Sequence, residues 1–336
     1  MAMNKKERVQ RALAGEAVDR PPISFWGHNY ARENSAEELA DETVTRFRRF
    51  DWDFVKLQSR ASSLCEDWGN HYQRSTEPAV RSTLLDWAVH STAELRRLRP
   101  LNPLAGALGE QIAALRLVRQ QLGPDVPILQ TIFAPAMVFS YLVGESPETM
   151  LEYVRGYPSE TRAALEAISE TYQEYAQACL ENGADGVFFA VKAAAAGEMT
   201  RDEYMRFGLP FDLSVLEAAG KGWINMLHMC GPDLYFEMVD HLPSQLLNWA
   251  LEHGNPGLAE GRERAKRTVI GGVSAKQRFR EMRPEQVVEQ VYAALNDTGG
   301  MRMMVGPGCS IPPDSPAENL FAAREAVDGW RPGKTA

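Results

Sequence analysis

Residues 159–191 have the sequence SETRAALEAISETYQEYAQACLENGADGVFFAV, and their pattern indicates the class of the fold. Its first part predicts one long helix over 159–182, because apolar side chains recur at helical spacing and Gly183 can end the helix. Its last part, 186–191, is short and apolar throughout, as expected of a strand that is buried on both faces. A helix that leads into a buried strand is the repeating unit of a parallel α/β fold.

The same alternation extends over the rest of the chain. Helical segments separate seven further short apolar stretches, at 22–26, 54–58, 127–133, 223–228, 245–249, 268–271 and 302–305. Eight strands with helical crossovers predict a (β/α)8 TIM barrel, and a barrel of this kind accommodates residues 1–336 as a single domain. An open doubly wound sheet is the alternative, and it is disfavoured because no G-x-G-x-x-G turn follows an early strand.

Residues 61–123 fit this alternation less regularly. We expect a small hairpin near 84–87 and a helix over 111–121. The stretch is therefore interpreted as an excursion inserted after the second strand, and a lid is one role that it could have.

Composition narrows the classes of function. The 336 residues include 36 Lys and Arg against 45 Asp and Glu, which gives a net charge of -9. This charge argues against nucleic acid or an anionic membrane as the main partner. No apolar run is long enough to span a bilayer, and no apolar stretch follows the basic start as it would in a signal peptide. We therefore expect a cytoplasmic protein whose 4 cysteines are reduced.

The group with the clearest chemistry lies at predicted strand ends, where a barrel carries its active site. His228 and Cys230 close the fifth strand, and a spacing of two points both side chains to the same side. Cys309 directly follows the eighth strand, between Gly and Pro residues. One imidazole and two thiolates suit Zn²⁺, and three protein ligands leave the open position of a catalytic site. The alternative is packing, because buried Cys and hydrogen-bonded His are common.

The chain also resembles the uroporphyrinogen decarboxylase superfamily along nearly its whole length. The amino-terminal resemblance lies in KERV at 6–9, GE at 15–16 and DRPP at 19–22. The segments DFVK at 53–56 and GADGV at 183–187, where predicted strands begin, also resemble that superfamily.

Within the superfamily, the sequence is most similar to the zinc-dependent corrinoid methyltransferases, typified by methylcobalamin:coenzyme M methyltransferase. Their hallmark is His-x-Cys followed far downstream by Cys, which here corresponds to His228, Cys230 and Cys309. The stretch PGCSIPPDSPAEN at 307–319 is also close to theirs. The resemblance implies a barrel with these three residues as zinc ligands.

Two departures separate the chain from a true uroporphyrinogen decarboxylase. That enzyme binds its anionic substrate with an arginine-rich segment after the first strand, whereas SFWGHNY at 24–30 contains no Arg. It also has an essential Asp at the end of the second strand, where this chain has Lys56, Leu57 and Gln58. Decarboxylation of that substrate is therefore not expected.

What the resemblance implies is a zinc-dependent methyltransferase that moves a methyl group between a corrinoid and a zinc-activated thiol or similar acceptor. The expected cofactors are Zn²⁺ and, as co-substrate, a corrinoid such as methylcobalamin. The expected partners are a corrinoid protein or free cobalamin, a small methyl acceptor or donor, and a second copy of the chain in a homodimer. No D-x-H-x-x-G corrinoid-binding signature is present, so the corrinoid should belong to a separate partner.

Other residues at strand ends are candidates for contact with the substrate. Lys56, Gln58 and His28 are assigned as catalytic candidates, because Lys56 and Gln58 share a face of the second strand and a buried Lys is costly unless paired or functional. The alternatives are a pairing of Lys56 with Glu66 or Asp67 and a turn at 28–29.

The candidates for substrate binding lie at or just after the ends of the first, fourth and sixth strands. They are Asn29, Lys192 and Asn248, with Glu252 as a further residue near the sixth strand.

Two other functions stay open at this point. A lyase acting on a different substrate would work without zinc, and would tolerate the replacement of Cys309 by Ser. A non-catalytic carrier of a corrinoid or tetrapyrrole would be purified with pigment and would show no turnover.

Overall fold

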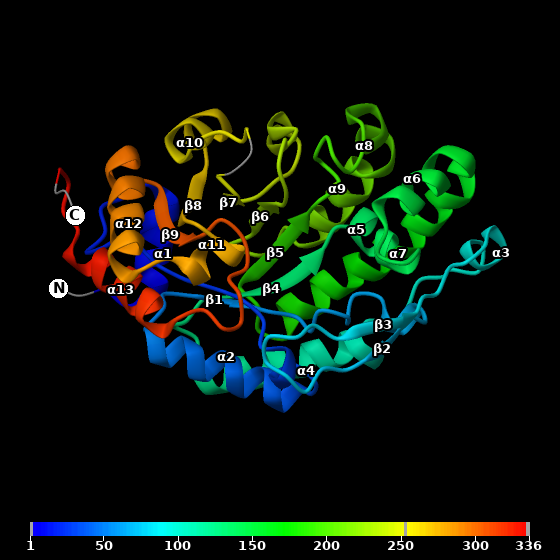
Figure 1. Cartoon of the computed structure of the whole chain (residues 1–336), viewed down its shortest axis with the longest axis horizontal. Coiled ribbons are helices and arrows are strands. Elements are labelled where there is room, and N and C mark those ends of the chain that lie inside the picture. The colour runs from blue at the N-terminus through cyan, green and yellow to red at the C-terminus, as the bar shows by residue number, and fades with distance from the viewer. Residues whose placement is uncertain (1–2, 252–253, 334–336) are drawn as a thin grey trace.

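Seven parallel strands form the central sheet of the computed structural model, which describes residues 3–251 and 254–333. The sheet is curled, with helices around its outer side (Figure 1). Its strands, in the order in which they lie side by side, are β1 (Val55–Leu57), β4 (Ile128–Phe133), β5 (Gly186–Val191), β6 (Met226–Met229), β7 (Leu246–Trp249), β8 (Thr268–Val273) and β9 (Met303–Pro307). The predicted α/β class is therefore confirmed.

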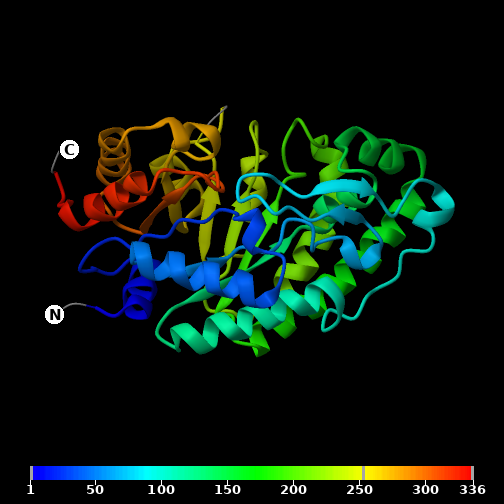
Figure 2. The same ribbon diagram turned by 60° about the horizontal axis from the view of Figure 1, so that its bottom comes forward.

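The helices connect successive strands and cover the outer face of the sheet (Figure 2). The long helix predicted over 159–182 is α7, Pro158–Glu181. The other α-helices are α1 (Lys5–Ala14), α2 (Ala36–Phe50), α3 (Thr92–Leu95), α4 (Gly106–Leu122), α5 (Pro135–Leu142), α6 (Pro147–Gly156), α8 (Arg201–Phe207), α9 (Leu209–Ala218), α10 (Leu258–Ala265), α11 (Lys276–Glu281), α12 (Pro284–Thr298) and α13 (Ala317–Gly329). Short 3-10 turns are η1 (Tyr30–Arg32), η2 (Glu66–Trp68) and η3 (Phe236–Asp240). None of the helices in the described ranges combines the length and apolar character needed to cross a bilayer.

The strand predicted at 22–26 is absent, so the sheet has seven strands instead of the eight expected. Only Ile23 makes a bridge, parallel to Val305 of β9. Pro21 and Pro22 have no N–H to donate, and the Ile23 N–H bonds to the Asp53 carboxylate at 2.8 Å instead of to a neighbouring strand. On the side of β1, one backbone hydrogen bond joins the Asp53 N–H to the Ile23 carbonyl. We call the join between residues 22–29 and β1 the seam.

A small antiparallel sheet lies within the predicted excursion. It pairs β2 (His71–Gln73) with β3 (Thr83–Asp86), which includes most of the expected hairpin at 84–87. The predicted helix at 111–121 is the larger α4, which packs beside α2 in the outer layer (Figure 2). Whether residues 61–123 act as an inserted lid stays a prediction.

Side-chain alternation divides the core into two parts. Val187, Phe189 and Leu227 point outward into the large cluster shared with the helices. Phe188 and Met226 point inward, into a smaller cluster on the concave face. Because side chains alternate along a strand, His228 follows Met226 onto the concave face.

Asp212 of α9 is a buried carboxyl group away from the concave face. It accepts a hydrogen bond from the Tyr204 hydroxyl at 2.9 Å, and burial raises the pKa of Asp212 to about 8, from 3.8. Between these pH values the folded chain keeps a proton that the unfolded chain releases, so the free energy of unfolding should fall as the pH rises from about 4 to about 8. Asp212→Asn should reduce this fall, as measured by denaturant unfolding at pH 5 and pH 8. Asp202→Asn, at an exposed position on α8, is the control, and equal pH dependence in all three proteins would contradict the prediction.

Candidate metal centre

His228 and Cys230 are placed by β6 and by the residue that follows it. Both neighbours of β6 are parallel, and His228 lies beside Ala190 of β5 and Asn248 of β7. Cys230 continues the pairing beyond β6, because its N–H bonds to the Val191 carbonyl at 2.8 Å. Gly231 then turns the chain away with a φ of 112°, a conformation that favours glycine.

Cys309 is placed by the turn after β9. The preceding Gly308 continues the ladder with β8, through a hydrogen bond from its N–H to the Val273 carbonyl. A Cβ at position 308 would lie 3.0 Å from the Cα of Ala250. Glycine therefore lets the loop that carries Cys309 approach the loop after β7 closely.

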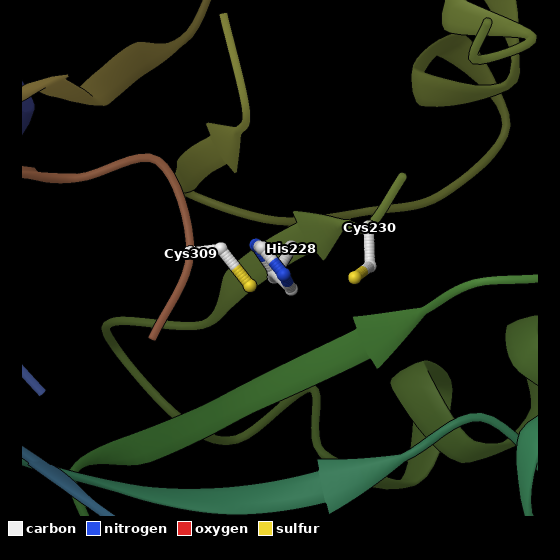
Figure 3. Close-up of side chains that lie close together, drawn as sticks. All are labelled: His228, Cys230 and Cys309. Carbon is white, nitrogen blue, oxygen red and sulfur yellow. The ribbon is translucent and has the colours of Figure 1, made fainter. Parts of the chain in front are cut away.

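These elements bring His228, Cys230 and Cys309 together at the carboxyl ends of the strands. Their ligand atoms all lie within 4.8 Å of one another. Figure 3 shows the imidazole of His228 with the sulfur atoms of Cys230 and Cys309 facing it. His228 belongs to β6, Cys230 follows that strand, and Cys309 lies in the loop after β9. The sequence predicts that these three residues belong to one site, and in the structure they lie in one cluster.

Asn248 fixes the orientation of the imidazole. Its Nδ2 donates to the carbonyls of Ile270 and Pro307, at 2.8 and 3.1 Å, which leaves its Oδ1 as an acceptor facing His228. The Nδ1 of His228 lies 2.6 Å from that oxygen and must carry the proton. The Nε2 lone pair is consequently free to bind a metal, and a partner on the other ring nitrogen is the usual arrangement around a metal-binding His.

The two thiols also interact with each other. A hydrogen bond from the Cys230 thiol holds the pKa of Cys309 well below its usual range, against the effect of burial. The same hydrogen bond, together with burial, raises the pKa of Cys230. The pair therefore favours one thiolate on Cys309, and thiolate is the form in which Cys binds metals.

The donor set fits Zn²⁺. Ligands of a single zinc ion lie about 3.5–3.8 Å apart at typical Zn–S and Zn–N distances, and the three atoms here are already within 4.8 Å. Two sulfurs and one imidazole nitrogen are a borderline-soft set, which favours zinc over magnesium or calcium. Three protein ligands leave the fourth position open to another molecule.

A second set of polar side chains, linked by hydrogen bonds, lies beside this cluster at the carboxyl ends of the strands, which we call the mouth of the sheet. Lys56 Nζ donates to Gln58 Oε1 at 2.6 Å, and Gln58 Nε2 lies 2.9 Å from His28 Nε2. The other nitrogen of His28 is 2.7 Å from Glu33 Oε2, and the second oxygen of Glu33 accepts from the Ala61 N–H. Because Gln58 Nε2 can only donate, neutral His28 accepts at Nε2 and donates to Glu33 at Nδ1.

The three catalytic candidates Lys56, Gln58 and His28 are therefore connected in one chain of hydrogen bonds. Glu33 was not among the residues predicted from the sequence, where its only signal is an acid five residues after His28.

Lys56 is buried and forms no ion pair with a carboxylate among the residues that the structure describes. The partners considered for it are wrong: Glu66 pairs with Arg60, and Asp67 accepts from the N–H groups of Ala107 and Leu108 at the start of α4. The ammonium instead lies over the ring of Phe188, 4.4 Å from its centroid. Burial lowers the pKa of Lys56 to about 7, although the charges of Cys309 and Glu33 act in the opposite direction.

The substrate-binding candidates lie in three different environments. Asn248 contacts the imidazole, as described above. Lys192 is partly exposed and pairs with Glu198 at 2.7 Å, so a structural partner accounts for its charge. Asn29 has a buried Oδ1 without a partner in the part of the chain that the structure describes. Glu252 lies outside the described residues.

Comparison with known proteins identifies the family. A family model described as uroporphyrinogen decarboxylase (URO-D) matches residues 4–330. The chain belongs to this family. The resemblance inferred from the amino-terminal motifs and the strand entries is thereby confirmed.

Proteins with two different names are similar to this chain. Methylcobamide:CoM methyltransferase MtaA of Methanosarcina barkeri is 24% identical over 348 residues, which cover 97% of this chain and 98% of MtaA. The uroporphyrinogen decarboxylase of Ovis aries is 24% identical over 249 residues, which cover 70% of this chain and 66% of the sheep protein.

A solved structure supports the same fold. A methyltransferase from Methanosarcina mazei superposes with a TM-score of 0.81 at 20% identity, over 97% of this chain and 98% of that protein. At this identity the likeness concerns the URO-D-like fold alone.

Proposed function

We propose that this URO-D family protein is a zinc-dependent methyltransferase that moves a methyl group between a corrinoid and a thiol. The observation that carries the proposal is the cluster of His228, Cys230 and Cys309, in which Asn248 leaves the imidazole Nε2 free. Relatives named methylcobamide:CoM methyltransferases match along 97% of the chain and support the same reaction.

The zinc ligands would be His228 Nε2 and the sulfurs of Cys230 and Cys309. When bound there, zinc lowers the pKa of a thiol in its open position, so that this thiol is present as thiolate at neutral pH. Asn248 holds the imidazole in the tautomer that can bind, and Phe188 stacks on it with 5.1 Å between ring centroids. Lys56 Nζ lies over the Phe188 ring, 4.4 Å from its centroid, where its charge can attract an anionic substrate.

The reaction has a simple electron balance. The thiolate forms a bond from sulfur to the methyl carbon, while the cobalt–carbon bond breaks and its electron pair stays on cobalt. The chain's own part is to hold the thiol in line with the methyl group. Because the chain has no corrinoid-binding signature, the corrinoid would be free methylcobalamin or belong to a partner protein.

The test is metal content together with methyl transfer. Protein purified without chelator should contain about one zinc per chain and should consume methylcobalamin in the presence of a thiol, as followed by absorbance. Removal of the metal should abolish this activity, and added zinc should restore it. Zinc-free protein that transfers methyl groups at the full rate would overturn the proposal, as would zinc-loaded protein that transfers none from methylcobalamin or a methylated corrinoid protein.

A further inference from the structure

Lys56 is a buried lysine whose surroundings suit both of its protonation states. It is 6% exposed, and among the described residues its Nζ has one hydrogen-bond partner, the neutral amide of Gln58 at 2.6 Å. The other contact of Nζ is the face of the Phe188 ring, which attracts an ammonium and can also accept an N–H from an amine. A buried lysine is usually paired with an acid, because its charged form loses hydration. Lys56 has no such pairing to hold it in the charged form.

The amide of Gln58 is fixed in an orientation that serves either form of Lys56. Gln58 Nε2 donates to His28 Nε2, and His28 Nδ1 donates to Glu33 Oε2. The other oxygen of Glu33 accepts from the Ala61 N–H, so a backbone group helps to set the direction of the whole chain. Gln58 Oε1 consequently faces Lys56 as an acceptor. An amine can donate one of its two hydrogens to this oxygen and keep its lone pair for a proton.

The charges that face Lys56 do not hold it in one form. Burial lowers the pKa of Lys56 to about 7, and the charges of Cys309 and Glu33 act in the opposite direction. On the side of α2, Glu42 and Arg46 line a cavity together with Lys56, and their charges are opposite. The neighbouring strands β4 and β5 contribute apolar side chains on this face. Both forms of Lys56 are therefore populated at neutral pH.

This cavity lies at the seam and gives Lys56 a connection to water. Its volume is about 40 Å³, which admits two to three waters. The indole Nε1 atoms of Trp26 and Trp52 are buried and have no hydrogen-bond partner among the described residues, and both rings line the cavity. Buried N–H groups of this kind usually bond to ordered water. Because Lys56 lines the same cavity, such waters are a route by which its proton can be exchanged.

Phe188 connects Lys56 to the metal centre. Its ring lies 4.4 Å from Lys56 Nζ and stacks on the imidazole of His228, with 5.1 Å between the ring centroids. A thiol that binds beside His228, Cys230 and Cys309 as thiolate releases one proton. It also adds one negative charge, because two cysteine thiolates already balance a divalent ion. A new negative charge nearby raises the pKa of a lysine and favours the ammonium.

We propose that Lys56 is the proton acceptor of the metal centre and takes up the proton of the bound thiol. The S–H bond breaks and leaves its electron pair on sulfur, while the lone pair of Nζ forms the new N–H bond. The resulting ammonium stabilises the thiolate, and it returns the proton to water once the methyl group has been transferred. The inference rests on the function proposed above, because it requires a thiol beside the metal ligands.

The test counts the protons released when a thiol binds to zinc-loaded protein without corrinoid. The probes are 2-mercaptoethanesulfonate and uncharged 2-mercaptoethanol, and titration calorimetry in buffers of different ionisation enthalpy gives the number of protons. Wild type should release about 0.9 proton per thiol at pH 6, where Lys56 is already charged, and less than about 0.5 at pH 8, where the amine takes the proton up.

Two variants remove the proton acceptor in different ways. Lys56→Met has no group that accepts a proton, and Lys56→Arg is charged at both pH values. Both should release about one proton per thiol at pH 6 and at pH 8. Lys5→Met of α1 is the matched control, because Lys5 also lies over an aromatic ring, that of Phe47, but pairs with Asp51 just before β1 begins. This control should release protons as wild type does.

The possible outcomes separate this inference from the proposed function. Release of a full proton by wild type at pH 8 would overturn the inference whether or not the variants fold, and so would equal release by wild type and the Lys56 variants at that pH. Either result leaves the proposed function standing. Zinc-loaded protein that binds neither thiol would refute the proposed function, and the inference with it.

Discussion

Replacement of Cys309 by Ser is expected to remove both the bound zinc and the methyl transfer activity. Serine lacks the thiolate that completes the ligand set, and the loop held by Gly308 offers no substitute at that position. Loss of a partner that only orients a ligand costs about 10- to 100-fold in metal affinity or activity. Loss of a ligand itself should cost more. The measurements are zinc per chain by elemental analysis and the rate of methylcobalamin consumption with a thiol.

Cys65→Ser is the matched control for this variant. Cys65 is also buried, and its sulfur is bonded to the Ser62 carbonyl and the Tyr72 hydroxyl, both of which can bond to serine. This variant should keep its zinc and its activity. A Cys309→Ser protein that lacks zinc and still transfers the methyl group at the full rate would contradict this prediction.

The grouping of His228, Cys230 and Cys309 could be predicted from the sequence because it depends on local rules. His228 and Cys230 are two residues apart on one strand, and the alternation of side chains puts them on the same side whatever the rest of the fold does. Cys309 could be added because parallel strands end at the same edge of the sheet. The alternation of helices and strands predicted the α/β class for the same reason.

The seam could not be predicted in this way. Residues 22–26 have the apolar composition of a strand, but two prolines and the carboxylate of Asp53 redirect their hydrogen bonds. This competition depends on a side chain about thirty residues away, which a local pattern does not contain. The arrangement of Trp26 and Trp52 around one cavity, with Arg46 from α2, is equally a property of the packing.

The partners of Lys56 show the same limit. Glu66 and Asp67 are near Lys56 in the sequence. In the structure, however, Glu66 pairs with Arg60, and Asp67 accepts hydrogen bonds at the start of α4. The link through Gln58 and His28 to Glu33 crosses between two segments that only the fold brings together. The sequence predicts that Asn248 lies near the mouth of the sheet, but it does not predict the contact of Asn248 with His228.

Asn248→Leu should lower zinc affinity by about 10- to 100-fold, because Asn248 is the residue that orients His228. Leucine has a similar size but cannot accept a hydrogen bond from His228 Nδ1. The imidazole can then rotate, or carry its proton on Nε2 instead of Nδ1. It also leaves the carbonyls of Ile270 and Pro307 without their donor. Affinity is measured by competition with a chromophoric chelator, and activity as for Cys309.

Asn225→Leu separates this effect from a loss of stability. Asn225 is also buried and bonds to backbone groups, accepting from Val187 and donating to Ala219, but it lies at the opposite end of β6 from His228. Both variants should lose stability, by about 1–3 kcal/mol for each buried group left unpaired. Only Asn248→Leu should lose zinc affinity, whereas Asn248→Asp, which keeps an acceptor for Nδ1, should retain more of it. If both leucine variants bind zinc as tightly as wild type does, the hydrogen bond from His228 to Asn248 contributes nothing to metal binding, and the imidazole must be held by its packing against Phe188.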